Sequence, residues 1–432
     1  MTLVGTYSFN NFASWSTMSW SDLKAKLQSE LSLRIVDPKD SPYAIVRYVK
    51  DQTKFTDPLA NLCRSVIVEK ATCRVVSLAP IRSLKESDEL LQAESAVWRT
   101  ESFLDGTMIN VFYTPSTQSI VVATRSRVGA CSSFDGKLSF DVQFNNALAA
   151  GNIDLAAIFQ AFRPSSSDTS VFATFVLAHP DNRIVTPVPA AALSLVQMGY
   201  TDVSGVVNVV EDPNSWLLPS QFNSLLVKTW DLGSARTIQD ITTWVQTTAK
   251  DLGFGWQGIV IKTGSGIRMR FRSDLYQAVR KLRGNENTLE ERFARLRSTR
   301  TLQQYLTFYG EDANKFYEFE GVLRRKTREL LNLYISTFIS KKQAYHELSW
   351  PFKYHVSVLH NMYKNTLKAK KLIVNQDVVI KYVNSLPSED VGNLLKVQVA
   401  KPQTTDAQPA AEQLIVAGSV DLSGNDLSGN DV

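Results

Sequence analysis

Four cationic side chains fall close together near the middle of the chain. Lys262 ends the run GIVIK, and the run RMRFR follows with three arginines that alternate with apolar residues, Arg268, Arg270 and Arg272. Arginine binds phosphate through a planar fork of N–H donors but stays protonated, so it can hold an anion without acting as a nucleophile. Two strands joined in a hairpin would gather these cations into one phosphate-binding surface. The same alternation also describes an ordinary strand with its polar residues outward, and this alternative stays open.

A second set of cations lies further along the chain. Residues 278–372 hold 19 Lys and Arg against 9 Asp and Glu, a net charge of +10, although the whole chain carries only +5. Two dense clusters stand out there, Arg324, Arg325, Lys326 and Arg328, and then Lys364, Lys368, Lys370 and Lys371. Either cluster alone could be a solvated helix face. Because Phe, Tyr and His are interleaved with several such clusters, we predict contact with RNA or DNA through phosphates and stacked bases.

Other kinds of site have little support in the sequence. The four histidines, His179, His346, His355 and His360, lack the i, i+4 or CxxC-type spacing of a zinc site, so no metal site is predicted. The three cysteines lie in apolar, strand-like surroundings, which favours reduced thiols over disulfides. No secretion signal is recognisable, and no apolar run approaches the roughly 20 residues of a membrane span. We therefore expect a soluble, intracellular protein that makes no membrane contact.

The elements that would position these cations change in type along the chain. A helix is predicted to begin at Ser21-Asp22 and to run through LKAKLQSEL. The chain up to about Arg272 is then rich in short β-branched or aromatic runs, at 44–49, 65–70, 108–113, 119–124, 171–178 and 258–262. Helical spacing recurs at Asn152–Phe162 and Ile238–Leu252. We therefore predict an α+β domain of antiparallel sheets with flanking helices.

The pattern becomes wholly helical from about Leu282. Apolar residues three and four apart recur in LEERFARLRS, in ANKFYEFEGVLRRKTRELLNLYISTFISKK and in KYHVSVLHNMYKNTLKAKK. The last part of the chain is rich in Pro, Gln, Thr and Ala and ends in DLSGNDLSGNDV, which has too little apolar surface to form a core. The predicted organisation is an α+β domain over 1–278, a basic all-helical domain over 279–398 and a disordered acidic tail over 399–432.

Several segments resemble motifs of one enzyme family in the order that the family has them. The pieces are LANLCRSVIVEK with VVSLAPIRSL, SFLDGTMINVFY, TRSRVG, TFVLAHPDNRIV, WQGIVIK and RMRFRSDLY. Together they resemble the bacteriophage-type ATP-dependent RNA ligases, which are covalent nucleotidyltransferases, over about residues 40–390. The resemblance implies a nucleotidyltransferase (RNA ligase-like) domain followed by an all-α C-terminal domain.

The resemblance also implies a chemistry that this chain departs from. In the family a motif lysine attacks the α-phosphate of ATP, and the nucleotide then passes to an RNA 5′-phosphate before the ends are sealed. Phe103 stands where the family has that lysine, and it has no lone pair to attack with. Val176 and Gln257 stand where the family has carboxylates, and neither can neutralise a divalent cation. No residue is therefore assigned as catalytic with confidence.

The positions that match the family are mostly cations. By resemblance, nucleotide or phosphate contacts are expected at Arg64, Asp105, Gly106, Arg125, Arg127, Arg183, Lys262, Arg270 and Arg272. Arginine stands at 125, 127, 270 and 272 where the family has lysine. Asp105 could instead be a turn residue before Gly106, and Lys262 could be an ordinary surface lysine.

Three hypotheses follow. The first is a catalytically inactive pseudo-ligase that binds RNA through the cationic groove and the basic helical domain, with nucleotide binding left open and no cofactor assigned. The second is an active ATP-dependent RNA ligase or nucleotidyltransferase that uses ATP and Mg²⁺ and a different nucleophile, such as Lys262 or His179. The third is a structural or assembly protein that retains only the fold. The oligomeric state is left open by the sequence.

Overall fold

The computed structural model describes residues 6–93, 98–133, 138–162, 169–210, 216, 218–264 and 266–396. The chain forms two compact units, Met1–Lys281 and a second that begins at Leu282, and the boundary falls within helix α7 (Asp274–Arg283). The predicted boundary stood at residues 278 and 279. The predicted acidic tail, 399–432, lies outside the described residues.

A six-stranded antiparallel sheet forms the centre of the first unit. Its strand order is β1-β11-β10-β9-β7-β8, with β1 (Thr6–Phe9), β11 (Val207–Val210), β10 (Ala192–Thr201), β9 (Ser170–Ala178), β7 (Thr107–Thr114) and β8 (Ser119–Thr124). Side chains alternate between its two faces. Phe112 and Phe172 pack on one face, whereas Val111 and Ala173 pack on the other.

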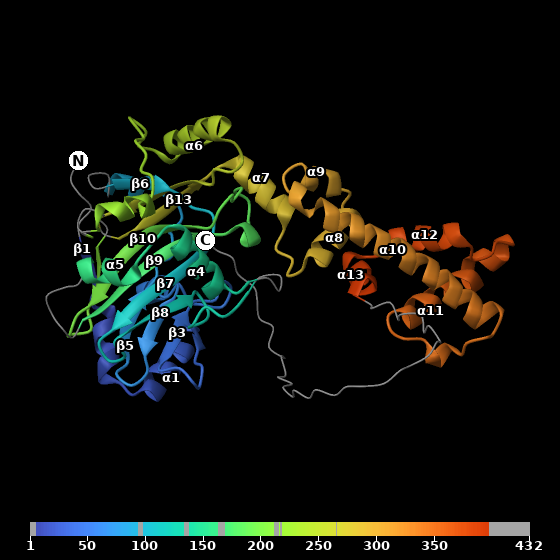
Figure 1. Cartoon of the computed structure of the whole chain (residues 1–432), viewed down its shortest axis with the longest axis horizontal. Helices are drawn as coiled ribbons and strands as arrows, with labels where there is room; N and C mark the ends of the chain where they lie inside the picture. Colours follow the sequence, from blue (N-terminus) through green and yellow to red (C-terminus); the bar gives the residue numbers. More distant parts are fainter. Residues whose placement is uncertain are drawn as a thin grey trace, which may run out of the picture. The chain divides into compact units, whose positions relative to one another are not determined.

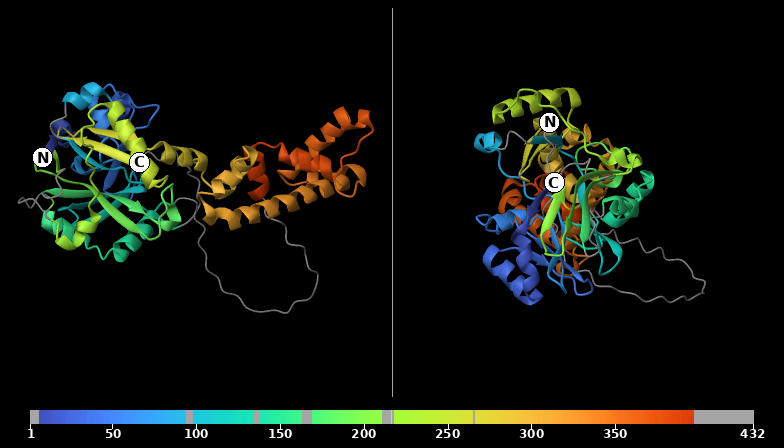
Figure 2. Two further views of the ribbon diagram at one scale, coloured as in Figure 1. Left: turned by 90° about the horizontal axis from the view of Figure 1, so that it is seen from above. Right: turned by 90° about the vertical axis from the view of Figure 1, so that its left-hand side faces the viewer.

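Each face of this sheet is covered by a different layer. One face packs on a four-stranded sheet and on α1 (Trp20–Leu31), while the other packs on α4 (Phe140–Ala150) and α5 (Leu155–Phe162). Figure 2 shows the green strands of the central sheet between these layers. The four-stranded sheet has the order β2 (Arg34–Val36), β3 (Tyr43–Arg47), β4 (Val66–Glu69), β5 (Arg74–Leu78). Among the described residues, the other α-helices of this unit, apart from α6 and α7, are α2 (Pro58–Leu62) and α3 (Asp88–Ala93), and a 3-10 helix spans Asn10–Thr17.

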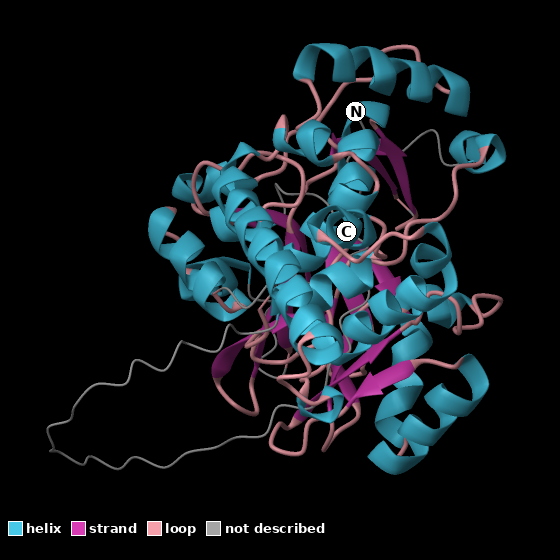
Figure 3. Ribbon diagram, turned by 90° about the vertical axis from the view of Figure 1, so that its right-hand side faces the viewer, coloured by secondary structure: helices cyan, strands magenta, loops and turns pink. Residues whose placement is uncertain are grey.

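A three-stranded antiparallel sheet carries the predicted cation cluster. It consists of β6 (Trp98–Ser102), β12 (Gly258–Thr263) and β13 (Arg268–Arg272), in the order β13-β12-β6. Helix α6 (Ile238–Leu252) lies over it, as Figure 3 shows. Ile241 and Val245 of α6 pack against Ile259 and Ile261 of β12 in a separate apolar core. The cationic residues of this sheet are therefore directed to its other face.

The second unit, in its described part, consists of helices and loops alone (Figure 1). Its helices are α8 (Leu289–Ser298), α9 (Leu302–Leu306), α10 (Ala313–Tyr334), α11 (Phe352–Met362), α12 (Gln376–Asn384) and α13 (Ser388–Lys396). Two π-helical turns, Ile335–Ile339 and Tyr363–Leu367, continue α10 and α11. One apolar core lies between α8, α10, α11, α12 and α13, and the buried rings of Phe293, Tyr305 and Phe316 pack together in a second group.

The predicted fold class is confirmed, because an α+β unit of antiparallel sheets precedes an all-helical unit. The predicted start of the first helix was two residues late. Ser19 caps α1, since its side chain accepts a hydrogen bond from the Asp22 backbone N–H at 3.2 Å. No helix in the described part of the chain is long and apolar enough to cross a membrane.

Candidate functional site

The candidate site is a cleft on the face of the three-stranded sheet that α6 leaves uncovered. Val260 pairs with Arg270 on one side and with Glu101 on the other, and Lys262 pairs with Arg268 and Arg99 in the same way. Paired residues in adjacent strands share one face, so these side chains point together. The cleft has a volume of about 40 Å³. Its lining includes Arg64, Glu101, Phe103, Val176, Arg268 and Arg270.

Phe103 lies in the wall of this cleft beneath two arginines. Its side chain is buried, at 7% exposure, and its backbone N–H donates to the Gly258 carbonyl at 2.9 Å, which fixes its place beside β12. The guanidinium carbons of Arg272 and Arg270 lie 5.0 and 5.8 Å from the centre of its ring. Cations at this distance are attracted to the face of an aromatic ring. Phe103 therefore acts as an apolar support for the arginines.

Glu101 and Lys262 form a buried ion pair at the floor of the site. Their charged atoms lie 2.9 Å apart, and the side chains are 4% and 2% exposed. Lys262 also donates to the Val196 carbonyl at 2.9 Å, and the Arg99 Nε lies 2.6 Å from the other Glu101 oxygen. Burial on its own would raise the pKa of Glu101, but Lys262 and Arg99 outweigh it and lower the pKa. Glu101 is thus an ionised carboxylate that is already neutralised by cations.

Arg64 and Arg268 bring positive charge to the cleft from two different sheet regions. Burial, followed by the positive charges of Arg268, Arg125 and Arg270, lowers the pKa of Arg64 to about 10. The guanidinium therefore remains charged at neutral pH while its neighbours repel it. Nε and Nη1 of Arg268 are buried and form no hydrogen bond within the described part of the chain. These are donors that an anion in the cleft would satisfy.

Asp105 is occupied by contacts inside the protein. Its Oδ2 accepts hydrogen bonds from the backbone N–H groups of Val185 and Thr186 at 2.8 and 2.9 Å, and its Oδ1 accepts one from the Tyr276 hydroxyl at 2.8 Å. Burial and the negative charge of Asp105 raise the pKa of Tyr276. The carboxylate ties the segment before β7 to the 183–186 loop and to α7. This geometry fits the structural alternative to the predicted phosphate contact.

Position 106 requires glycine because its backbone passes close to β9. A Cβ atom at Gly106 would lie 2.4 Å from the Leu177 carbonyl oxygen and 2.8 Å from the Val176 side chain. Neither approach is possible for a larger residue without movement of a strand. Its position is explained without a bound ligand.

Gln257 and Val176, the two residues that replace carboxylates, occupy different surroundings. Val176 is 8% exposed and lines the cleft with Phe103. Gln257 is 2% exposed, and neither its side-chain oxygen nor its nitrogen forms a hydrogen bond with the described residues. Leaving a buried amide unpaired costs about 1–3 kcal/mol, so a polar group bound beside Gln257 would be stabilised.

The other predicted phosphate contacts are distributed around the first unit. Arg125 donates from Nε to the Arg64 carbonyl at 3.3 Å, and its guanidinium lies 4.9 Å from the Tyr48 ring centre. Arg127 is exposed, and Arg183 donates from Nε to the Val185 carbonyl at 3.1 Å. Neither of these two residues lines the cleft.

His179, a possible alternative nucleophile, holds a local turn. Its side chain is 6% exposed, and its Nδ1 accepts a hydrogen bond from the Asp181 backbone N–H at 3.2 Å. In this geometry Nδ1 is used inside the protein, and His179 does not line the cleft.

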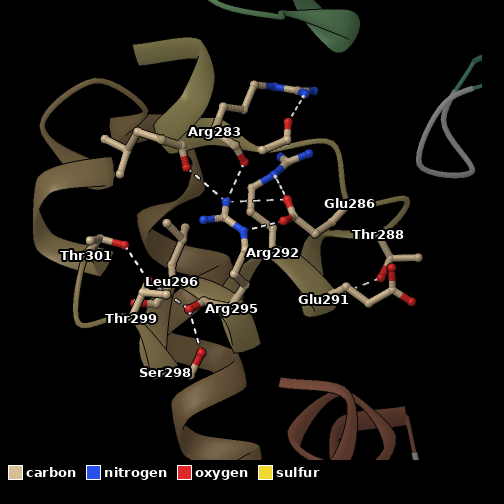
Figure 4. A network of polar contacts seen from close by, with 12 residues as sticks. Arg283, Glu286, Thr288, Glu291, Arg292, Arg295, Leu296, Ser298, Thr299 and Thr301 are labelled. Atoms are coloured by element: carbon tan, nitrogen blue, oxygen red, sulfur yellow. Dashed lines mark hydrogen bonds and ion pairs between the residues drawn. The ribbon is translucent and has the colours of Figure 1, made fainter. Parts of the chain in front are cut away.

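Several cations of the helical unit form ion pairs inside it. Figure 4 shows Arg295 contacting both Glu286 and the Arg283 carbonyl oxygen, the latter at 2.8 Å, while Arg292 lies 3.9 Å from the same carboxylate. Arg297 lies 3.6 Å from Glu320. These arginines hold the first helices of the unit together. The net charge of +10 already counts these carboxylates, so the ion pairs leave it unchanged and show only which arginines are engaged inside the unit.

The two predicted RNA-binding clusters differ in exposure. In the first, Lys326 is only 1% exposed and pairs with Glu329 at 3.1 Å, and Arg324 lies 3.5 Å from Glu320. Arg325 and Arg328 are exposed. In the second, all four lysines are exposed and form no ion pair within the described part of the chain, namely Lys364, Lys368, Lys370 and Lys371. The second cluster is therefore the more accessible of the two.

One residue of the site was missed by the sequence analysis. Glu101 sits two residues before Phe103 in the run WRTESF, and alternation along that run would have placed the two on one face of a strand. Its partner Lys262 lies on the adjacent strand β12, which is distant in sequence, so no local pattern predicts the pair. No group of three or more His, Cys, Asp or Glu residues that could hold a metal ion occurs among the described residues.

Comparison with known proteins gives limited similarity. No protein-family model matches the sequence, and no curated protein matches it. Among solved structures, two forms of an archaeal ATP-dependent RNA ligase are similar at TM-scores of 0.36 and 0.33, with 14% and 13% identity, and each alignment covers 68% of this chain and 71% of that chain. A Naegleria gruberi RNA ligase mutant with ATP and Mn is similar at a TM-score of 0.30, with 13% identity over 45% of this chain and 55% of that chain. TM-scores this low assign no function.

Proposed function

We propose that this protein is a pseudo-ligase, an RNA-binding protein with the motif order of an RNA ligase and no covalent nucleotidyl transfer. The packing around Phe103 is the main observation that supports this proposal. At the position where the motif order expects a lysine, an apolar ring is packed beneath Arg270 and Arg272 in a cation-lined cleft. The site holds cations suited to phosphate but offers no amine to attack one.

The most obvious substitute nucleophile is poorly suited to the reaction. Lys262 is 2% exposed and donates to both Glu101 and the Val196 carbonyl. An attacking amine must lose its proton and reach the phosphorus in line, at about 3–3.5 Å. Both requirements would break the buried ion pair. This favours the inactive protein over an active ligase that uses ATP and Mg²⁺.

The cationic donors of the cleft suit a phosphate group. The buried Nε and Nη1 donors of Arg268, and the mutual repulsion that lowers the pKa of Arg64, would both be relieved by an anion. We propose that phosphates of bound RNA fill this role, with the exposed lysines of the helical unit as a second contact.

Two measurements test this function. Incubation with α-labelled ATP or GTP and Mg²⁺ or Mn²⁺, followed by denaturing electrophoresis, should give no acid-labile, base-stable adduct. A stoichiometric adduct would refute the proposal, and its loss in Lys262→Ala would identify the nucleophile. In parallel, RNA affinity should fall steeply with salt, by a slope of about 0.7 per contacted phosphate in single strands.

A groove variant separates specific phosphate contacts from general charge. Arg270→Gln combined with Arg272→Gln should weaken RNA binding and lower the salt slope by about 1.4. The control is Arg74→Gln on β5, which removes one charge and whose guanidinium donates to the Val203 carbonyl on another part of the unit, so the effects are compared per charge removed. The structural or assembly role would be favoured if the salt slope fell equally per charge removed in the groove variant and in Arg74→Gln. Self-association of the protein with no RNA affinity would favour the same role.

A further inference from the structure

The segment between α10 and α11 exposes aromatic rings among lysines. Within residues 341–354, here called the aromatic–lysine segment, Trp350 is 67% exposed, Tyr354 52% and Tyr345 39%. Lys341, Lys342 and Lys353 share the segment, and neither predicted RNA-binding cluster includes any of these residues. Large exposed rings are unusual unless they serve a partner.

Internal contacts hold the segment in place. The Lys342 backbone N–H donates to the Ser336 carbonyl at 2.8 Å, and the Tyr345 ring lies 6.2 Å from the Phe338 ring at the end of α10. The Lys353 ammonium lies 5.3 Å from the centre of the Tyr345 ring. These contacts join the two ends of the segment, so the rings and cations form one surface.

Trp350 and Tyr354 lie at the start of α11. Pro351 is the N-cap residue of the helix, so Trp350 precedes the helix and Tyr354 belongs to its first turn. The Lys353 N–H donates to the Ser349 carbonyl at 2.9 Å, and the His355 N–H donates to the Pro351 carbonyl at 3.2 Å, which fixes the backbone on both sides of Trp350. Both rings are thus presented from an ordered helix start, and both are more than half exposed.

The charge around the segment is almost entirely positive. Residues 335–375 contain seven lysines, no arginine and one acidic residue, Glu347. That carboxylate accepts a hydrogen bond from the Ala344 backbone N–H at 3.2 Å and closes a turn. Lys341, Lys342 and Lys353 form no ion pair within the described part of the chain. An anionic partner would meet seven lysines and a single exposed carboxylate in this stretch of the chain.

We infer that the aromatic–lysine segment is a binding site for single-stranded RNA, with bases stacked on Trp350 and Tyr354 and phosphates held by the neighbouring lysines. Bases in a duplex are stacked on each other and cannot offer their faces to a side chain, whereas unpaired bases can. The inference rests on the proposed RNA-binding function.

The test compares full-length variants by fluorescence anisotropy. The probes are a labelled 12-nucleotide oligouridylate and a blunt RNA duplex of the same length. Trp350→Ala and Tyr354→Ala should each weaken binding of the single strand by at least fivefold, the lower end of what loss of one stacked base costs. Binding of the duplex should change less than twofold, and Trp350→Phe should retain most of the single-strand affinity.

The control is another exposed aromatic residue of the same unit. Tyr317 on α10 is 73% exposed but is followed by Glu318 and Glu320, so Tyr317→Ala should leave both affinities unchanged. Thermal melting of each variant excludes unfolding as the cause of any loss.

Four results would overturn the inference. The first is wild-type single-strand affinity in both Trp350→Ala and Tyr354→Ala, and the second is an equal loss of affinity for duplex and single strand. The third is an equal loss of affinity in Tyr317→Ala. The fourth is binding to anionic phosphatidylserine vesicles that Trp350→Ala abolishes while RNA affinity stays constant. A wild-type protein that binds no RNA at all would refute the proposed function as well. Failure of the aromatic variants alone, with the Arg270 and Arg272 effects intact, refutes only the stacking site.

Discussion

The Lys262 ammonium lies 2.9 Å from a carboxylate oxygen of Glu101, and both side chains are buried beneath the cation-lined cleft. The Val196 carbonyl takes a second hydrogen bond from the same ammonium at 2.9 Å. Both contacts are made by a protonated amine, which has no lone pair to attack phosphorus. The pair therefore joins β12 to β6 and leaves phosphate binding to the arginines above it.

Removing one member of this pair should destabilise the first unit. Lys262→Met leaves the Glu101 charge buried with Arg99 as its remaining close partner, so we expect the free energy of unfolding to fall by about 3 kcal/mol. Urea unfolding followed by circular dichroism at pH 7 measures this. The double variant Lys262→Met with Glu101→Gln should recover part of the loss, because it removes the uncompensated charge. A single variant as stable as the wild type would contradict the buried pair.

The same pair predicts how stability depends on pH. Burial would raise the pKa of Glu101, but Lys262, Arg99 and Arg268 outweigh it, so the folded-state pKa lies below the unfolded value of about 4.3. The carboxylate then stabilises the fold above the unfolded pKa, and this contribution is lost as pH falls through the folded pKa. The stability gap between wild type and Glu101→Gln should thus be constant from pH 7 to 5 and shrink at lower pH. Glu30→Gln, an exposed change on α1, should show little gap at any pH.

Local patterns predicted the elements that have strong periodicity. Helix α6 begins and ends at the predicted Ile238 and Leu252, because its apolar face has a 3.6-residue period and Thr237 caps it with Asp240. Strand β8 likewise covers the predicted 119–124. Strand β10 was not among the predicted runs. A register shift between Leu195 and Gln197 interrupts its alternation, and Gly199 is required by the approach of the Phe172 ring from β9 and of the Asn208 carbonyl oxygen from β11.

The cationic face of the cleft could also be predicted from the sequence, whereas the ion-pair partner of Lys262 could not. Alternation in RMRFR places Arg268, Arg270 and Arg272 on one face, as the structure has them. The pairing of Lys262 with Glu101 depends on two strands that are distant in sequence, and no spacing rule reports it. The burial of Lys326 did have a local pattern, since Leu323, Thr327 and Leu330 mark the core stripe of α10 on which it falls.

Asp105 should matter for stability more than for ligand binding. Asp105→Ala removes three hydrogen bonds to a charged group and leaves the Tyr276 hydroxyl and two backbone N–H groups without that acceptor, so we expect a loss of about 3 kcal/mol or more. Tyr276→Phe removes only one of these bonds and should cost about 1–2 kcal/mol. Chemical denaturation of both variants measures the difference. If Asp105→Ala keeps wild-type stability but loses RNA affinity, the phosphate-site role implied by the resemblance is correct instead.

The two basic clusters of the helical unit should respond differently to neutralisation. Lys326 is buried, pairs with Glu329 and lies 5.1 Å from the Phe352 ring centre, so Lys326→Ala should lower the melting temperature and leave the RNA affinity of the folded protein unchanged. Lys364→Gln with Lys368→Gln changes exposed side chains, and stability should stay within about 0.5 kcal/mol. If both lysines contact phosphates of single-stranded RNA, the salt slope of binding should fall by about 1.4.

A matched control distinguishes local contact from loss of overall charge. Lys315 is 60% exposed and pairs with Glu318 at the start of α10, so Lys315→Gln removes one charge, as each single lysine variant of the 364–371 cluster does, from a site that carries its own counter-ion. Its salt slope should stay at the wild-type value. An equal fall in slope for Lys315→Gln and for either lysine of the 364–371 cluster would mean that RNA responds to net charge alone. A fall confined to the cluster would place RNA on this face of the helical unit, since counter-ion release reports only the phosphates that a cation neutralises directly.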